Sequence, residues 1–172
     1  SYVRNAAWHL ASTRENMAPI ANGLALALAD AVPKILKNGV SLLHDIESAK
    51  TVVLESIEEQ ERALRTRNDA LIEQSCRVIE SLAKRHDGTS KISIMTLSLS
   101  STVTRVIQGL IDGGIAVDIT VCESRPLCEG VVAAKQFHAM GAETVTLITD
   151  AQLASYIEKS DIALCGADSL TA

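Results

Sequence analysis

Four short runs rich in β-branched residues, separated by stretches of helical character, constrain the fold of this chain more than any other feature of its sequence. The runs are KISIMTLS, IAVDITVC, ETVTLIT and DIALCG, at residues 91–98, 115–122, 143–149 and 161–166. Each connection is long enough for one helix of about 10 to 15 residues. A strand, helix, strand repeat with connections of this length requires right-handed crossovers and a parallel sheet. The pattern therefore predicts an open, doubly wound α/β unit.

The first half of the chain has a different pattern. Residues 1 to about 86 have the periodicity of helices, and the segment 17–32, MAPIANGLALALADAV, is apolar almost all round. Such a helix is expected inside a helical packing rather than on a surface, and Pro33 is expected to end it or to start a new helix. From about Val40 to Lys84, one long amphipathic helix, or two with a break near Asn68, satisfies the pattern.

The compact turn RHDGTS, at residues 85–90, is the best domain boundary in the sequence. We therefore predict a helical domain at residues 1–86 and a Rossmann-like α/β domain at residues 87–172. If nothing followed residue 172, the sheet would keep an open edge. We expect the second domain to be incomplete, truncated at its C-terminus, and the chain to be part of a longer protein.

The composition argues against several classes of partner. A formal net charge of -5 and a sequence pI near 5.4 disfavour the broad basic face that nucleic acid or an anionic membrane surface would need. The apolar segment 17–32 is too short to span a bilayer. Four cysteines without a CxxC pair favour a reducing compartment and hence a cytoplasmic location. The four histidines have no metal-ligand spacing, so no metal site is predicted.

Polar residues follow all four predicted strands. In open parallel sheets the ligand crevice lies beyond the carboxyl ends of the strands. The segments expected to share this edge are Ser98 to Thr102, Glu123 to Arg125, Thr149 with Asp150, and Gly166 to Asp168. The sequence therefore predicts a binding site at one edge of the sheet.

The chemistry of this edge favours a phosphate. The turn after the first strand, SLSSTVTRV, has no glycine, which argues against a nicotinamide or flavin, and we predict no cofactor. The hydroxyls of Ser100, Ser101 and Thr102, with the backbone N–H groups of a helix start, can cradle a phosphate. Arg125 would add a bidentate donor. Ordinary N-capping remains the simpler explanation of the hydroxyls when that turn is taken alone.

Two charged residues at the edge also have alternative explanations. Arg125 could pair with Glu123 or with Asp168 and have a purely structural role. Asp168 ends an apolar strand, where a carboxylate commonly needs a partner or a task, and we predict a functional role for it.

Three motifs taken together, TVCESRPLCEG, TLITDAQLASYI and ALCGADSL, resemble those of one protein family. That family joins the alpha, beta and delta subunits of translation initiation factor 2B with ribose-1,5-bisphosphate isomerase and 5-methylthioribose-1-phosphate isomerase. The resemblance covers about residues 88–172, with the motifs in the right order and spacing. The helical first half fits the family's N-terminal helical domain in general character.

The resemblance implies an isomerase site in which a cysteine and an aspartate move protons at the sugar carbonyl and its neighbouring carbon. Asp168 stands at the aspartate position and Arg125 at that of an arginine that helps to hold phosphate, but Ser98 stands at the cysteine position. A serine hydroxyl is a much weaker acid than a thiol. Glu129 stands where the isomerases tend to have a substrate-contacting glutamine, and a carboxylate there would repel a sugar phosphate.

These departures favour a regulatory or scaffold protein related to the initiation-factor subunits. Such a protein would sense a phosphorylated sugar or nucleotide and assemble with copies of itself or with related subunits. The alternative is a sugar-phosphate aldose-ketose isomerase that uses Asp168 with an unusual partner. Cys122, Cys128 and Cys165 are each expected to pack in the core. Cys128 has an alternative role, because it lies near a helix start, where the pKa of a thiol can be lowered.

Overall fold

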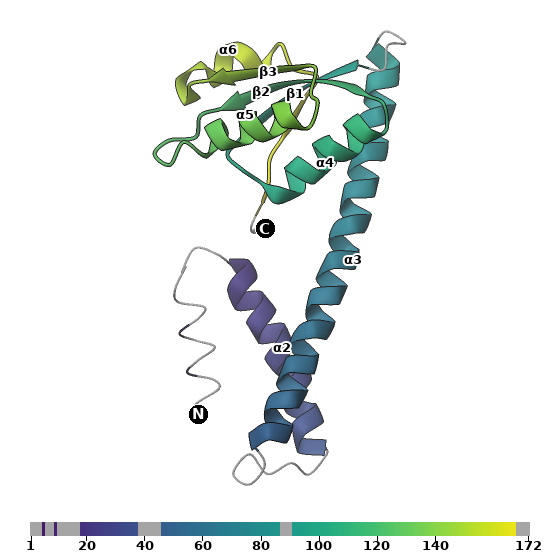
Figure 1. The fold of residues 1–172 in the computed structure, drawn as a ribbon, viewed down its shortest axis with the longest axis vertical. Helices are drawn as coiled ribbons and strands as arrows, with labels where there is room; N and C mark the ends of the chain where they lie inside the picture. The colour runs from purple at the N-terminus through teal and green to yellow at the C-terminus, as the bar shows by residue number, and fades with distance from the viewer. Residues whose placement is uncertain (1–4, 6–8, 10–17, 38–45, 87–90, 168–172) are drawn as a thin grey trace. The chain divides into compact units, whose positions relative to one another are not determined.

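The structure is a computed structural model that describes Asn5, His9 and residues 18–37, 46–86 and 91–167 (Figure 1). Two compact units divide the chain, one built mainly from Ser1–Arg67 and the other from Asn68–Gly166. This division falls inside helix α3, which runs without a break from Ile46 to His86. The domain boundary expected between residues 86 and 87 therefore stays a prediction, and the break considered near Asn68 does not interrupt the helix.

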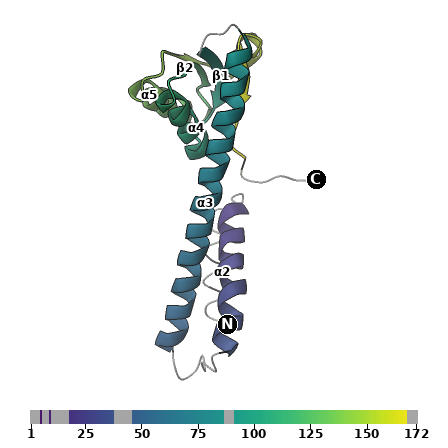
Figure 2. The ribbon, with the colours of Figure 1, turned by 90° about the vertical axis from the view of Figure 1, so that its right-hand side faces the viewer.

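The helical unit pairs α2, Ala18–Lys37, with the first part of α3, and the two run side by side in opposite directions (Figure 2). Ala27, Ala31 and Ile35 are buried at a spacing of four residues, which places them on one stripe of α2. An ion pair joins the helices, because the Lys34 ammonium lies 3.1 Å from a carboxylate oxygen of Glu59.

Two expectations about α2 were wrong. Pro33 lies inside α2 and does not end it. Ile35, which follows on the buried stripe, keeps the last turn packed although a proline cannot donate a backbone hydrogen bond. The segment 17–32 is also not enclosed on all sides, since Leu26 and Val32 are exposed in the part of the chain that the structure describes.

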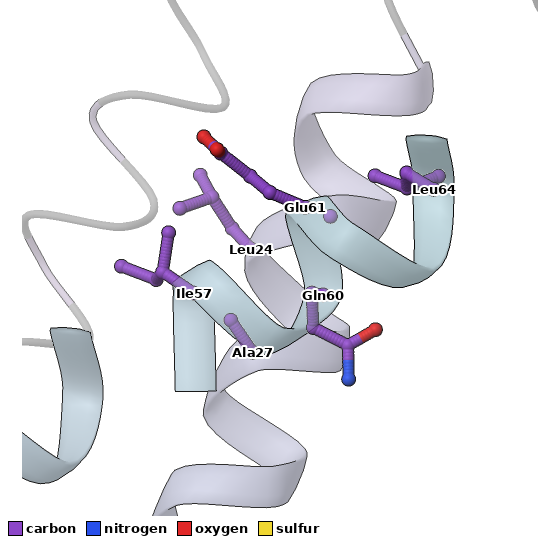
Figure 3. A pocket seen from close by; sticks show the side chains of 7 residues that line it. Leu24, Ala27, Ile57, Gln60, Glu61 and Leu64 are labelled. Atoms are coloured by element: carbon purple, nitrogen blue, oxygen red, sulfur yellow. The ribbon is translucent and has the colours of Figure 1, made fainter. Parts of the chain in front are cut away.

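A shallow apolar groove runs between α2 and α3 within the helical unit (Figure 3). Its lining consists of Gly23, Leu24, Ala27, Ile57, Gln60, Glu61 and Leu64. The only charged side chain in this lining is the carboxylate of Glu61, so the groove is poorly suited to an anion. None of the helices in the described ranges is both long enough and apolar enough to cross a membrane.

The second unit contains the predicted parallel sheet. Its strands are β1 Lys91–Leu97, β2 Ala116–Cys122, β3 Thr144–Ile148 and β4 Ile162–Leu164, in the order β3-β2-β1-β4. All three neighbouring pairs are parallel. The connecting helices are α4 Ser101–Asp112, α5 Glu129–Ala139, and a 3-10 turn η1 Asp150–Gln152 that continues into α6 Leu153–Ile157. A helical N-terminal part followed by an α/β unit is therefore confirmed.

The alternation of side chains along the strands builds two apolar layers. Ile92 and Ile94 of β1 point to the face that carries the larger core, together with Phe137 of α5. Met95 points to the opposite face, where it joins a smaller cluster that includes Tyr156 of α6. Figure 1 agrees, with α6 on one side of the sheet and α4 and α5 on the other.

The strand order creates a crevice position between β1 and β4. The chain steps outward from β1 to β2 and β3 and then crosses back to form β4 on the other side of β1. At such a switch point the connections at the carboxyl ends diverge, which leaves room for a ligand. The buried Thr96 hydroxyl donates to the Leu164 carbonyl at 2.9 Å and ties the two strands together at that end.

Replacement of Phe137 tests the packing of the larger core. We expect Phe137→Ala to lower the free energy of unfolding by about 3–5 kcal/mol, because the ring is 1% exposed and its loss leaves a cavity. The matched control on the same helix is Val132→Ala, at a side chain that is 49% exposed, with an expected change within about 0.5 kcal/mol. Urea unfolding followed by circular dichroism measures both, and equal losses would contradict this assignment of the core.

Candidate functional site

Ser98 and Ser124 connect two of the polar turns at the carboxyl edge of the sheet. The backbone N–H of Ser98, after β1, donates to the Ser124 hydroxyl oxygen at 2.6 Å. That hydroxyl in turn donates to the Cys122 carbonyl at 3.2 Å. The Ser98 hydroxyl donates to a carboxylate oxygen of Glu129, in the first turn of α5, at 2.7 Å. The turns after β1 and β2 therefore lie against each other, as the topology predicted.

The turn after β3 joins the same site through Asp150. Its two carboxylate oxygens accept the backbone N–H groups of Ser124 and Arg125, each at 2.8 Å. These two hydrogen bonds favour the charged form, and they lower the pKa of the Asp150 carboxyl below its ordinary value. Asp150 does not cap the helix that follows it, because Thr149 is the N-cap of η1, and the Thr149 N–H donates to the Gln152 side chain at 3.1 Å.

Three residues of this edge have an unusual backbone conformation. Ser98, Ser124 and Cys128 have φ values of 60°, 62° and 53°, which place non-glycine residues in the left-handed region. Each such residue costs on the order of 1 kcal/mol or more and persists only where its surroundings hold it. Residues in this region cluster at binding and catalytic sites, so their concentration here marks this edge as the candidate site.

Arg125 has the structural pairing that the sequence left open. Its Nε donates to a carboxylate oxygen of Glu123 at 2.8 Å. The Arg125 side chain is 73% exposed, whereas that of Glu123 is 17% exposed. Because a guanidinium carries five N–H donors, a bond through Nε still allows the terminal nitrogens to contact an anion.

The predicted hydroxyl cluster stands at the start of α4. Ser100 is the N-cap, and its side chain accepts the Val103 N–H at 3.4 Å, so N-capping is confirmed for this residue. Ser101 and Thr102 are the first two residues of the helix.

Two glycines allow the turns to approach one another, and the sequence analysis missed one of them, Gly130. A Cβ on Gly130 would lie 1.8 Å from the Cys122 carbonyl oxygen, so only glycine lets α5 start so close to the end of β2. A Cβ on Gly166 would lie 2.6 Å from the Ser100 hydroxyl oxygen, so the turn after β4 passes directly beside the start of α4. The signal that could have indicated Gly130 is its position in the first turn of a predicted helix, where glycine is costly.

Asp168 lies outside the described residues, and its role stays a prediction. Cys122 is buried, and burial raises the pKa of its thiol. Cys128 is the N-cap residue of α5. Cys165 is exposed, so the expectation of core packing was wrong; it follows the last residue of β4, a strand at the edge of the sheet.

Metal binding has no support in the described part of the chain. Among those residues, no group of three or more histidine, cysteine, aspartate or glutamate side chains is arranged to hold an ion. The arrangement at the carboxyl edge instead offers an exposed cation, the N–H groups of a helix start and three nearby carboxylates, those of Glu123, Glu129 and Asp150.

The perturbed carboxyl of Asp150 predicts a pH dependence of stability. Its pKa is depressed in the folded state, so its contribution to stability is complete above the unfolded pKa of about 3.9 and is lost as the pH falls through the folded pKa. We expect Asp150→Asn to have a lower melting temperature than the native protein above about pH 4, with a gap that narrows toward pH 2. Thermal unfolding at a series of pH values measures this gap. A gap that widens on acidification would contradict the role given to this carboxylate.

Comparison with known proteins gives a consistent result. The sequence profile of the Initiation factor 2 subunit family matches residues 1–172. Two curated relatives are archaeal proteins named ribose 1,5-bisphosphate isomerase. The Methanocaldococcus jannaschii protein is 33% identical over 110 residues, which are 62% of this chain and 35% of that protein. The Archaeoglobus fulgidus protein is 32% identical over 138 residues, which are 77% of this chain and 43% of that protein.

Solved structures share the fold at lower sequence identity. Translation initiation factor eIF-2B from Pyrococcus horikoshii OT3 superposes with a TM-score of 0.75 and 20% identity, covering 97% of this chain and 51% of that one. A chain of the tetrameric eIF2B-beta2-delta2 complex from C. thermophilum gives a TM-score of 0.60 at 17% identity, with 98% and 51% coverage. This chain therefore spans about half the length of these structures, and less than half that of the two curated relatives.

Proposed function

Because this chain belongs to the Initiation factor 2 subunit family, we propose that it is a regulatory or scaffold protein that binds a small phosphorylated ligand without isomerising it. The observation that carries the proposal is the 2.7 Å hydrogen bond from the Ser98 hydroxyl to the Glu129 carboxylate. Ser98 follows the first strand, at the position where the family's isomerases are expected to have a cysteine.

The chemistry of this pair argues against proton transfer. An aldose-ketose isomerisation needs a group that gives a proton to one carbon or oxygen and takes one from its neighbour near neutral pH. A serine hydroxyl is too weak an acid for this role. The adjacent Glu129 carboxylate opposes ionisation of Ser98 still further, because it would place two negative charges in contact.

Binding of an anion has separate support. The exposed guanidinium of Arg125 and the start of α4, with Ser101 and Thr102, lie on the same edge of the sheet and suit a phosphate. The Glu129 carboxylate accepts hydrogen bonds and repels a further negative group. A ligand with one phosphate and free hydroxyl groups, such as a sugar monophosphate or a nucleotide, fits this combination better than a bisphosphate.

Assembly is the second part of the proposal. One structural neighbour is a chain of a complex described as tetrameric, and we infer that this protein also associates with copies of itself or with related subunits. Exposed apolar side chains on α2, among them Leu26, Val32 and Leu36, are consistent with a further contact. We also propose a cytoplasmic location, because the described cysteines are free thiols, as is usual in a reducing compartment.

The competing function is isomerisation of a phosphorylated sugar. It is favoured by the names of the two curated relatives, both ribose 1,5-bisphosphate isomerases. In that case Asp168 would be one proton-transfer group, and Glu129, in contact with Ser98, is the described carboxylate nearest to the position of the missing cysteine.

Assays with defined sugar phosphates separate the two functions. The full-length protein is incubated with ribose 1,5-bisphosphate and with 5-methylthioribose 1-phosphate, and the ketose product is measured by NMR. We expect no product above the uncatalysed reaction from the native protein, because Ser98 cannot replace a thiol in proton transfer. Ser98→Cys, which restores the thiol, is the positive comparison, with Asp168→Asn as its control. Turnover by the native protein that disappears in Asp168→Asn would overturn the regulatory proposal.

A further inference from the structure

We propose that Asp150 is a positioning residue, whose carboxylate holds the turn from Glu123 to Arg125 in the conformation that presents the Arg125 guanidinium to a ligand. This proposal rests on the proposed ligand-binding function. It adds a residue from a third strand connection, one that does not itself have to touch the ligand.

The contact between Asp150 and this turn is bidentate. Oδ1 accepts the Ser124 N–H and Oδ2 accepts the Arg125 N–H, both at 2.8 Å. Hydrogen bonds from a carboxylate to two successive N–H groups fix the directions of two adjacent peptide planes. The same bonds stabilise the charged carboxylate, so the anchor is strongest when Asp150 is ionised.

Ser124 carries this constraint to the neighbouring elements. Its carbonyl accepts the Cys128 N–H at 2.9 Å, and its hydroxyl accepts the Ser98 N–H and donates to Cys122. Ser124 is in the left-handed conformation, which a non-glycine residue adopts only when its surroundings hold it. Without the Asp150 carboxylate, the Ser124 N–H would lose its hydrogen-bond acceptor, and Ser124 would lose its link to the turn after β3.

Arg125 is thereby anchored at two points. Asp150 fixes its backbone N–H, and Glu123 accepts its Nε–H at 2.8 Å. Glu123 itself is held, because its N–H donates to the Ile148 carbonyl at 2.8 Å and its carbonyl accepts the Gly130 N–H at 3.1 Å. The terminal nitrogens of the Arg125 guanidinium remain available to an anion. Because the residue is already held in place, binding an anion loses less conformational entropy.

Helix capping does not account for the geometry of Asp150. Thr149 is the N-cap of η1, and the Asp150 side chain bonds to the turn after β2, on a different strand connection. The chain also offers a matched comparison at the other end of the sheet. Asp161 accepts the Ser93 N–H at 2.7 Å near the start of β1, so it has the same bond chemistry without a place at the carboxyl edge.

The first experiment observes the anchor without any ligand. The amide protons of Ser124 and Arg125 are followed by NMR in the full-length protein between about pH 2 and pH 6, a range that spans the titration of an aspartate. We expect both resonances to shift together in the native protein as Asp150 is protonated, and the shift to be absent in Asp150→Asn. Resonances that stay constant in the native protein over this range would overturn the proposal.

The second experiment measures ligand affinity by calorimetry, with inorganic phosphate and the sugar monophosphate ribose 5-phosphate as probes. We expect Asp150→Ala and Arg125→Ala each to weaken binding by roughly tenfold to a hundredfold, as expected for loss of hydrogen bonds to a charged group. The double variant should bind no more than about twofold more weakly than the weaker single variant, because both changes remove one interaction. Asp150→Asn, which keeps one acceptor oxygen, should recover part of the affinity.

Asp161→Ala separates positioning from general stability. We expect this control to lower the melting temperature but to keep the native affinity within about twofold, since its bond lies at the amino end of the sheet. Equal losses of affinity in Asp161→Ala and Asp150→Ala would overturn the positioning role. If the native protein binds neither probe, the proposed function fails, and the NMR titration alone then decides whether Asp150 holds the turn.

Discussion

Parallel pairing of β1 with β2 on one side and with β4 on the other is the constraint on which the rest of the α/β unit depends. Parallel strands have all their carboxyl ends at one edge, so every polar turn that follows a strand is delivered to the same place. The buried Thr96 hydroxyl, bonded to Leu164, keeps β1 and β4 together at that edge. The crevice position at the switch point follows from this order and not from any single side chain.

Hydrogen bonding at that edge holds a backbone that an isolated peptide would seldom adopt. Three non-glycine residues with positive φ lie within two turns, and Ser124 connects those turns to β2 and β3. Gly130 lets the start of α5 lie close to the end of β2, because any side chain at this position would collide with the Cys122 carbonyl. Several non-glycine residues with positive φ close together are typical of binding sites and are seldom found in ordinary connections.

The proposed ligand binding and the competing isomerisation differ in a small amount of chemistry. Anion binding needs a cation and N–H donors on a rigid edge, and in the proposed function Arg125 and the start of α4 have these roles. Isomerisation needs in addition a group that exchanges protons near neutral pH. The Ser98 hydroxyl, paired with a carboxylate, is poorly suited to that step. The proposed function therefore requires the anion-binding edge of the fold but not a group that exchanges protons.

The sequence by itself determined the strand and helix pattern, the parallel sheet and the identity of the edge that carries the polar turns, because periodicity and connection length are local properties. It also indicated Ser98, Arg125 and Glu129 through their positions in motifs. Only the tertiary structure decided that Ser98 pairs with Glu129 and that Asp150 anchors the Arg125 turn instead of capping its own helix. Those partners lie 25 or more residues apart, and the packing of separate strands, which no local pattern encodes, brings them within hydrogen-bond distance.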